Sequence, residues 1–302
     1  MKKQHKSLLI LLLTAMIWGF AFVAQLVGAN SVGTFTFNAV RFMLGGVSLI
    51  PVILIFERQK TEKSRLRTTI FAAVAAGVIL FGASTLQQLG ITYTGSAGKA
   101  GFLTGIYTVI VPIIGIFLKR KTSINTWIGA VLTVIGLYFV SFCDGFSSVG
   151  AGDIVLIIGA FMWALHIIVI DTFSNRIYSL RFAAIQFITC AMLSTICALM
   201  FEDISLAAVM EAKLPILYAG IMSVGVAYTC QIIGQKHADP TAASIILSTE
   251  SIFSALGEAI MLGLILPGWD YTPLSPLNYL GCGIIFCAVI ISQLNFKKQK
   301  NT

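Results

Sequence analysis

The chain has 302 residues, of which 57% are hydrophobic and 11% are charged, whereas a soluble domain carries roughly 25% charged residues. The net charge of +8 does not indicate a nucleic-acid binder, because the basic residues lie in short clusters between long apolar stretches and form no basic face interleaved with aromatic residues. Composition and charge therefore exclude an ordinary soluble domain and favour an integral protein of the lipid bilayer.

Ten stretches are long and apolar enough to cross a bilayer as a helix, which takes about 20 residues. In chain order we expect these spans at 7–27, 34–56, 68–88, 97–118, 125–143, 153–171, 181–201, 214–235, 241–263 and 276–295. The first follows three lysines and so resembles a signal peptide, but its length and the spans that follow it favour a retained helix. Pro112 predicts a kink in the fourth span. The expected fold is an all-α membrane protein with ten transmembrane helices.

The basic residues predict the orientation of these helices. If the N-terminus lies in the cytoplasm, 17 of the 20 Lys and Arg residues fall on the cytoplasmic side, as the positive-inside rule requires. An even number of spans then returns the C-terminus to the same side. We expect a multi-pass protein of the cytoplasmic (inner) membrane with both termini in the cytoplasm.

A shift of about 145 residues aligns the first half of the sequence with the second. Four pairs of aromatic or polar residues then coincide, namely Trp18 with Trp163, Arg41 with Gln186, Gln87 with Gln231 and Tyr107 with Glu250. Each half contains five spans, and two copies of an odd repeat must cross the membrane in opposite directions. The alignment predicts two inverted five-helix repeats, 1–145 and 146–302, with a substrate site between them near the bilayer midplane.

Short motifs in four spans resemble one known family. They are "IWG" in the first span, "FNAVRF" in the second, "AGFLTGIYTVIVP" in the fourth and "LSTESIFSALGE" in the ninth. Over essentially its whole length the chain resembles the EamA-type members of the drug/metabolite transporter (DMT) superfamily, although Ser251 stands where that pattern usually has proline. The resemblance implies ten spans and transport of a small metabolite, often outward, without a nucleotide motor.

Glu250 is the most informative polar residue, because a charge at the bilayer centre costs at least about 2.5–3.5 kcal/mol. It lies near the middle of the ninth span, and Ser254 and Glu258 follow on the same helix face. One interpretation makes Glu250 a proton carrier or a ligand for an amine. The alternative is a protonated side chain held by the hydroxyl of a neighbour.

Aromatic and amide side chains in other spans complete the expected binding site, and such a lining suits a neutral or zwitterionic metabolite. The candidate substrate-binding residues are Trp18, Gln87, Tyr107, Trp163, His166, Tyr228, Gln231 and Glu250, and Glu250 is also the candidate coupling residue. Each glutamine could instead form an interhelical hydrogen bond, worth about 0.6 kcal/mol on average. His166 and the two tryptophans could equally be packing residues.

Arg41 and Glu258 form a further candidate pair. At 1.5 Å per residue they lie roughly 10 Å and 8 Å below the outer edge of the membrane, and each is costly there without a partner. The sequence thus predicts that they pair when the outer side is closed, either as a gate or as a permanent brace between helices.

No enzyme motif accompanies these residues. The sequence contains no Walker glycine loop, no H-E-x-x-H and no G-x-S-x-G, so we expect no enzymatic activity, no cofactor and no metal. The leading hypothesis is a secondary transporter, and more specifically an exporter, of a small organic metabolite such as an amino acid, with proton coupling through Glu250 as an option. The alternatives are a flippase for a lipid-linked carrier and a non-transporting scaffold or receptor.

Overall fold

The computed structural model describes residues 2–58, 62–120, 122–141, 150–261 and 275–293, and these residues fold into helices with no strand among them. The elements are α1 (Lys2–Ala29), α2 (Thr34–Phe56), α3 (Lys63–Thr94), α4 (Ala97–Gly105), α5 (Tyr107–Phe117), α6 (Ile124–Ser141), α7 (Ala151–Phe173), α8 (Ser179–Phe201), α9 (Leu206–Glu211), α10 (Lys213–Leu217), the π-helix η1 (Tyr218–Tyr228), α11 (Thr229–Gln235), α12 (Pro240–Leu247), α13 (Glu250–Ile260) and α14 (Pro276–Gln293).

Within the described ranges, eight helical segments are long and apolar enough to cross a bilayer. They correspond to the predicted spans except the fifth and the tenth, which appear as the shorter apolar helices Ile124–Phe139 and Pro276–Ser292. The predicted ends of the fifth, ninth and tenth spans, at 143, 263 and 295, lie outside the described residues. The structure thus supports an all-helical membrane fold with eight spans and two shorter helices.

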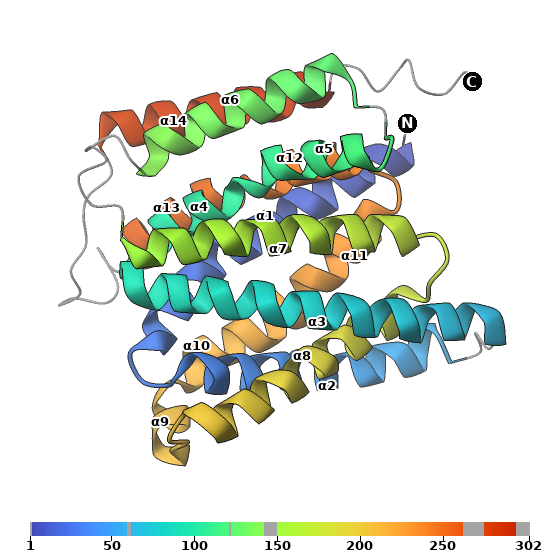
Figure 1. Cartoon of the computed structure of the whole chain (residues 1–302), viewed down its shortest axis with the longest axis vertical. Coiled ribbons are helices and arrows are strands. Elements are labelled where there is room, and N and C mark those ends of the chain that lie inside the picture. The colour runs from blue at the N-terminus through green and yellow to red at the C-terminus, as the bar shows by residue number, and fades with distance from the viewer. Residues whose placement is uncertain (1, 59–61, 121, 142–149, 262–274, 294–302) are drawn as a thin grey trace.

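The helices lie side by side in a bundle (Figure 1), with α6 and α14 paired at one edge and α2 and α8 paired at the opposite edge. Two helices occupy the middle. α1 packs against η1, α11, α12 and α13, whereas α7 packs against α3, α4 and α5. We call the end where α1 and α3 begin the N-terminal end of the bundle, and the other the opposite end.

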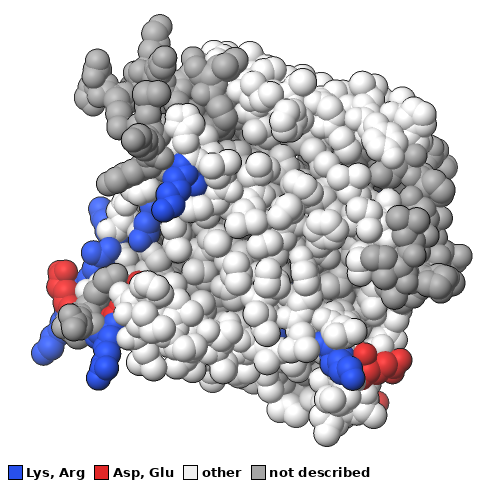
Figure 2. Space-filling model, turned by 180° about the vertical axis from the view of Figure 1, so that it is seen from behind, with Lys and Arg blue, Asp and Glu red and all other residues white. Residues whose placement is uncertain are grey.

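The surface of the bundle matches this arrangement. Large apolar side chains on the flanks are exposed, among them Phe71, Phe117 and Phe201. Figure 2 shows most of the visible Lys and Arg residues at one end, a smaller charged group at the other, and a band without charges between them. Such a band is what the hydrocarbon core of a bilayer requires.

A sharp turn joins the third and fourth spans. Gly95 ends α3 in the left-handed conformation with φ of 64°, which glycine adopts without a steric penalty. The hydroxyl of Ser96 then accepts a hydrogen bond from the amide N–H of Lys99 (3.2 Å) and caps α4. The segment between the third and fourth spans is therefore a helix end followed directly by a helix start.

The fourth and ninth spans are each broken near their middle. α4 ends at Gly105 and α5 begins at Tyr107, so the break lies at Ile106, in the span where Pro112 predicts a kink. In the ninth span, Ser248 and Thr249 separate α12 from α13, which begins at Glu250. The hydroxyls of Ser248 and Thr249 donate to main-chain carbonyls three residues earlier, each at 2.7 Å, and such bonds compete with regular helix geometry.

Candidate solute site

The two breaks face a buried cavity between the central helices, which contains about 20 Å³ of free space, room for roughly one water molecule. Seven of the eight predicted binding residues line it: Trp18, Gln87, Tyr107, Trp163, Tyr228, Gln231 and Glu250. Its wall also includes Ala21, Phe22, Gln25, Arg41, Thr104, Ile167 and Ser223. The structure thus brings together residues from both halves of the chain.

Tyr107 and Glu250, which the internal alignment matched to each other, are in direct contact. The Tyr107 hydroxyl donates to Oε1 of Glu250 over 3.0 Å, and both side chains are buried. Each residue is the first of the helix that follows a break, so Glu250 also lies in the first turn of α13, where the helix dipole favours negative charge. A carboxyl held by one hydroxyl fits both interpretations of Glu250 given above.

An aromatic cluster forms another wall of the cavity, and Tyr228 is at its centre. The ring of Tyr228 lies 4.6 Å from Trp18 and 6.0 Å from Trp163, measured between centroids, and the two tryptophans are 6.4 Å apart. The indole N–H of Trp18 donates to the carbonyl of Ser223 over 3.4 Å. Faces of this kind contact the apolar part of a solute without a directional requirement.

His166 does not line the cavity. Its ring packs edge-on against Trp163 and Tyr228, and its Nε2 is 3.0 Å from Oε1 of Gln186. Because Nε2 of His166 is already hydrogen-bonded to the Gln186 side chain, the structure favours the packing interpretation of His166. His166 thus contacts two rings of the cavity wall without lining the cavity itself.

Several polar atoms at the cavity have no hydrogen-bond partner among the described residues. They are Oε1 of Gln25, Nε and Nη2 of Arg41, Oγ1 of Thr104, Nε1 of Trp163 and Oε1 of Gln231. A buried polar group without a partner is costly, and most such groups in proteins are satisfied. Their concentration at one place favours a site that binds a polar molecule.

Four polar residues of the lining are outside the predicted binding set, namely Gln25, Arg41, Thr104 and Ser223. Helical spacing places Gln25 on the face of Trp18 and Thr104 on the face of Tyr107, because they follow Trp18 by seven residues and precede Tyr107 by three. Ser223 and Tyr228 are five residues apart within η1, where a π-helix brings residues i and i+5 together. The α-helical period therefore could not have indicated Ser223. The fourth residue, Arg41, was assigned to a different role.

The expected pair of Arg41 and Glu258 is not formed in this structure. Glu258 instead accepts hydrogen bonds from the hydroxyl of Ser96 (3.2 Å) and from the amide N–H of Gly98 at the start of α4. The guanidinium of Arg41 lies over the ring of Phe42, 4.9 Å from its centroid. The two residues were predicted to lie at similar depth in the membrane, but depth alone does not say on which side of the bundle each residue lies. The partner of Glu258 is a helix N-terminus rather than a cation.

The face of α13 that carries Glu258 forms a seam with α4, which runs from the cavity toward the opposite end of the bundle. Glu250, Ser254 and Glu258 lie along it, as their spacing predicted. Gly101 lies directly against Ser254, and Gly98 lies against Glu258. A β-carbon at Gly101 would overlap the hydroxyl of Ser254, so a larger residue there forces that side chain to move.

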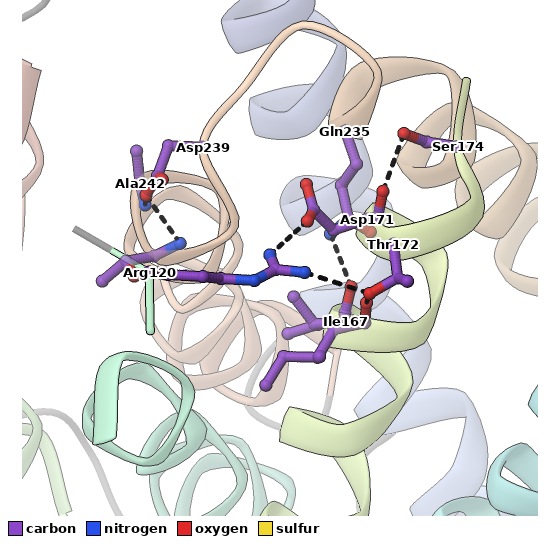
Figure 3. Close-up of polar contacts among 10 residues, drawn as sticks. Arg120, Ile167, Asp171, Thr172, Ser174, Gln235, Asp239 and Ala242 are labelled. Carbon is purple, nitrogen blue, oxygen red and sulfur yellow. Dashed lines mark hydrogen bonds and ion pairs between the residues drawn. The ribbon is translucent and has the colours of Figure 1, made fainter. Parts of the chain in front are cut away.

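A charged cluster lies at the N-terminal end of the bundle (Figure 3). The guanidinium of Arg120 forms an ion pair with Asp171 at the end of α7 and donates to the hydroxyl of Thr172 over 3.0 Å. Nearby, the carboxylate of Asp239 caps α12 by accepting from the amide N–H groups of Thr241 (3.0 Å) and Ala242 (3.3 Å). Burial raises the pKa of Asp239, and the neighbouring Asp171 adds to the rise, while the capping amides and Arg120 oppose it.

Comparisons with known proteins agree with this architecture. The EamA-like transporter family matches the chain twice, at residues 5–142 and 150–294. An "uncharacterized transporter" of Archaeoglobus fulgidus is 29% identical over 290 residues, covering 94% of this chain and 84% of the relative. The uncharacterized transporter YoaV of Bacillus subtilis is 22% identical over 308 residues, covering 98% and 99%.

A solved crystal structure shares the fold, with a TM-score of 0.73 and 18% identity over 96% of this chain and 97% of that one. The two family matches span nearly the whole sequence and coincide with the two sets of helices that meet at the cavity. The chain therefore belongs to the EamA-like transporter family and is a multi-pass membrane transporter.

Proposed function

We propose that the protein is a secondary transporter that exports a small polar organic solute, with amino acids as the first candidates, across the cytoplasmic membrane by alternating access. The observation that carries this proposal is the contact between Tyr107 and Glu250, which joins the two broken spans inside a cavity lined with aromatic and amide groups. Broken helices at the membrane midplane are a common setting for substrate sites in transporters. The outward direction is what the family resemblance implies.

The packing of the helices supports an arrangement as two inverted repeats. The first span contacts the eighth and ninth through η1, α11, α12 and α13, and the sixth span contacts the third and fourth through α3, α4 and α5. Exchanging the two halves converts one set of contacts into the other. Repeats related in this way can swap conformations, which is the basis of alternating access.

The free space of about 20 Å³ in the cavity is too small for an organic solute in this conformation. A binding conformation must therefore widen it. The α4–α13 seam would separate to open the opposite end, which we expect to face the exterior because most basic residues lie toward the other end. The contacts of Arg120 would separate to open the cytoplasmic end.

Glu250 is the proposed coupling residue. A carboxyl at this depth is costly to ionise while it is sealed from water, so we expect it to gain or lose a proton when one side of the cavity opens. The bond from Tyr107 gives the carboxyl one fixed donor. A solute with an amine would compete for the same oxygen atoms and thereby link its own binding to the proton.

Reconstituted protein in liposomes, screened for solute uptake with and without a pH gradient, tests this function. Glu250→Gln keeps the shape and one acceptor for Tyr107, so we expect folding and part of the solute binding to remain while accumulation driven by the gradient is lost. Glu211→Gln, which changes an exposed acid far from the cavity, is the matched control. If Glu250→Gln still concentrates solute with the wild-type pH dependence, Glu250 is not the coupling residue.

A further inference from the structure

Arg41 is a buried cation without an anionic partner among the described residues. It is only 2% exposed, and it lines the cavity from α2. The described ion pairs join Lys99 to Asp153 and Arg120 to Asp171, so neither includes it. Because the guanidinium keeps its proton at any physiological pH, the cavity contains a fixed positive charge.

The immediate surroundings of this charge are aromatic rather than acidic. The guanidinium carbon lies 4.9 Å from the ring centroid of Phe42 and 5.4 Å from that of Phe37. Ring faces offset part of the cost of burying a cation, but they accept no hydrogen bond of the strength that an N–H of arginine can make. Nε and Nη2 have no hydrogen-bond partner in the described structure.

These two nitrogens form one edge of the guanidinium fork. Nε–H and one Nη–H point in parallel and match the two oxygens of a carboxylate, which is why arginine binds planar acids in a bidentate manner. The cavity already contains one carboxyl, Glu250, but Tyr107 holds it on α13. No hydrogen bond or ion pair joins Glu250 to Arg41 among the described residues.

We propose that Arg41 is the anion subsite of the cavity, and that the transported solute carries a carboxylate which binds the Nε–Nη2 edge of this arginine. This inference rests on the proposed function and narrows its substrate class from polar organic solutes to carboxylates. An amino acid satisfies both ends of the site, with its carboxylate at Arg41 and its ammonium group toward Glu250. The aromatic wall around Tyr228 contacts the remainder of the solute.

A purely structural role for Arg41 makes a different prediction. If the cation only packs against Phe37 and Phe42, removing it changes stability but not the choice between ligands. Arg65 provides the matched control, because its guanidinium carbon lies 4.9 Å from the ring centroid of Tyr178 but the residue is outside the cavity and donates to the carbonyl of Ile177.

The test measures ligand-induced thermal stabilisation of the full-length protein in detergent. The probes are the common amino acids and a series of simple carboxylates, each compared with its own primary amide, which keeps the shape and removes the charge. We expect at least one acid to bind wild type about tenfold or more tightly than its amide. Arg41→Gln should abolish this difference, Arg41→Lys should keep part of it, and Arg65→Gln should leave it unchanged.

The comparison of acid with amide in wild type needs no variant, so the proposal stays testable if Arg41→Gln does not fold. Equal binding of acids and amides, an unchanged preference in Arg41→Gln, or no binding of any carboxylate overturns the anion subsite. Transport is measured separately in liposomes. Binding of carboxylates without transport of any solute would refute the proposed function but support the anion subsite. Transport of cations or neutral solutes alone would support the proposed function but refute the anion subsite.

Discussion

Glu57 and Glu202 cap each other's helices. Glu57 follows the end of α2, and its carboxylate accepts from the amide N–H groups of Leu180 (3.3 Å) and Arg181 (3.2 Å) at the start of α8. Glu202 follows the end of α8 and accepts from the amide N–H groups of Phe35 and Thr36 at the start of α2, each at 2.8 Å. The two helices are therefore joined at both ends by the same kind of contact.

The relation between these two glutamates extends the internal repeat. They are 145 positions apart, which is also the distance between the first residues of the two family matches. Each carboxylate satisfies N–H groups that a helix start leaves without a partner and lies at the positive end of the helix dipole. Reciprocal caps hold α2 and α8 together whichever end of the cavity opens, so we expect this pair to move as one unit.

We therefore predict that Glu202→Ala lowers the free energy of unfolding by about 0.5–2 kcal/mol, the range for loss of an N-terminal cap. The hydroxyl of Thr36 also donates to this carboxylate, at 2.7 Å, which places the effect toward the upper limit. Thermal unfolding in detergent measures it. The exposed neighbour Asp203 provides the control, and an Asp203→Ala protein equally destabilised would argue against the cap.

The seam between α4 and α13 gives a second prediction. Gly101→Ala places a methyl group against Ser254, and overpacking of this kind costs about 1–3 kcal/mol. The closed seam should become less populated, so a cysteine introduced at Thr104, in a background without native cysteines, should react faster with an impermeant thiol reagent added from outside.

Gly115→Ala is the matched control for this experiment. Gly115 lies in the other part of the same broken span, and the nearest atom to an added β-carbon is Cβ of Arg120 at 3.9 Å, an ordinary contact. An unchanged labelling rate in folded Gly101→Ala protein would show that the seam does not gate the cavity.

Asp239 predicts a pH dependence of stability at the N-terminal end of the bundle. Its pKa is raised above the usual value of 3.8, mainly by burial, so the folded state holds the proton more tightly than the unfolded chain. Such a group destabilises the fold once it is ionised, and the penalty grows as pH rises from about 4 through the raised pKa. Asp239→Asn keeps a capping oxygen for α12 and removes the ionisation.

We therefore expect Asp239→Asn to match wild type near pH 4 and to be more stable near pH 7, in thermal unfolding curves recorded across this range. Asp239→Ala, which removes the cap as well, should be less stable than Asp239→Asn at every pH. Parallel pH profiles for wild type and Asp239→Asn would contradict the raised pKa as the cause.

Composition and length were sufficient to predict the helical membrane fold, because a span needs only apolar residues over a bilayer thickness. The breaks before Tyr107 and Glu250 were not predictable in this way. In the ninth span the break depends on hydroxyl groups that bond to their own main chain, and the hydropathy of a segment does not reveal which polar side chains turn inward. The fourth span, where Pro112 predicts a kink, does contain a break, which lies at Ile106, whereas Pro112 itself is inside α5.

The site was predictable where a residue's cost in the membrane or its repeat partner identified it, as for Glu250, Tyr107 and the two tryptophans. It was not predictable where a side chain bonds to a main-chain group, or where the helix that carries the residue is not an α-helix. The contact of Glu258 with the amide of Gly98 is an example of the first, and Ser223 in η1 is an example of the second. Arg41 was also assigned to a pair with Glu258 on the assumption that a buried charge needs an opposite charge in the protein, whereas it lines the cavity with no ion pair among the described residues.

The π-helix η1 gives the eighth span two possible windings. Its N–H groups bond five residues back, and a shift to the carbonyls four residues back would convert the segment to an α-helix. Each residue by which the hydrogen-bond pattern shifts would then rotate α11 about the helix axis relative to α10 by about 100°. Gln231 lies in the first turn of α11, which continues from η1, so this rewinding would change the direction of its amide relative to the cavity.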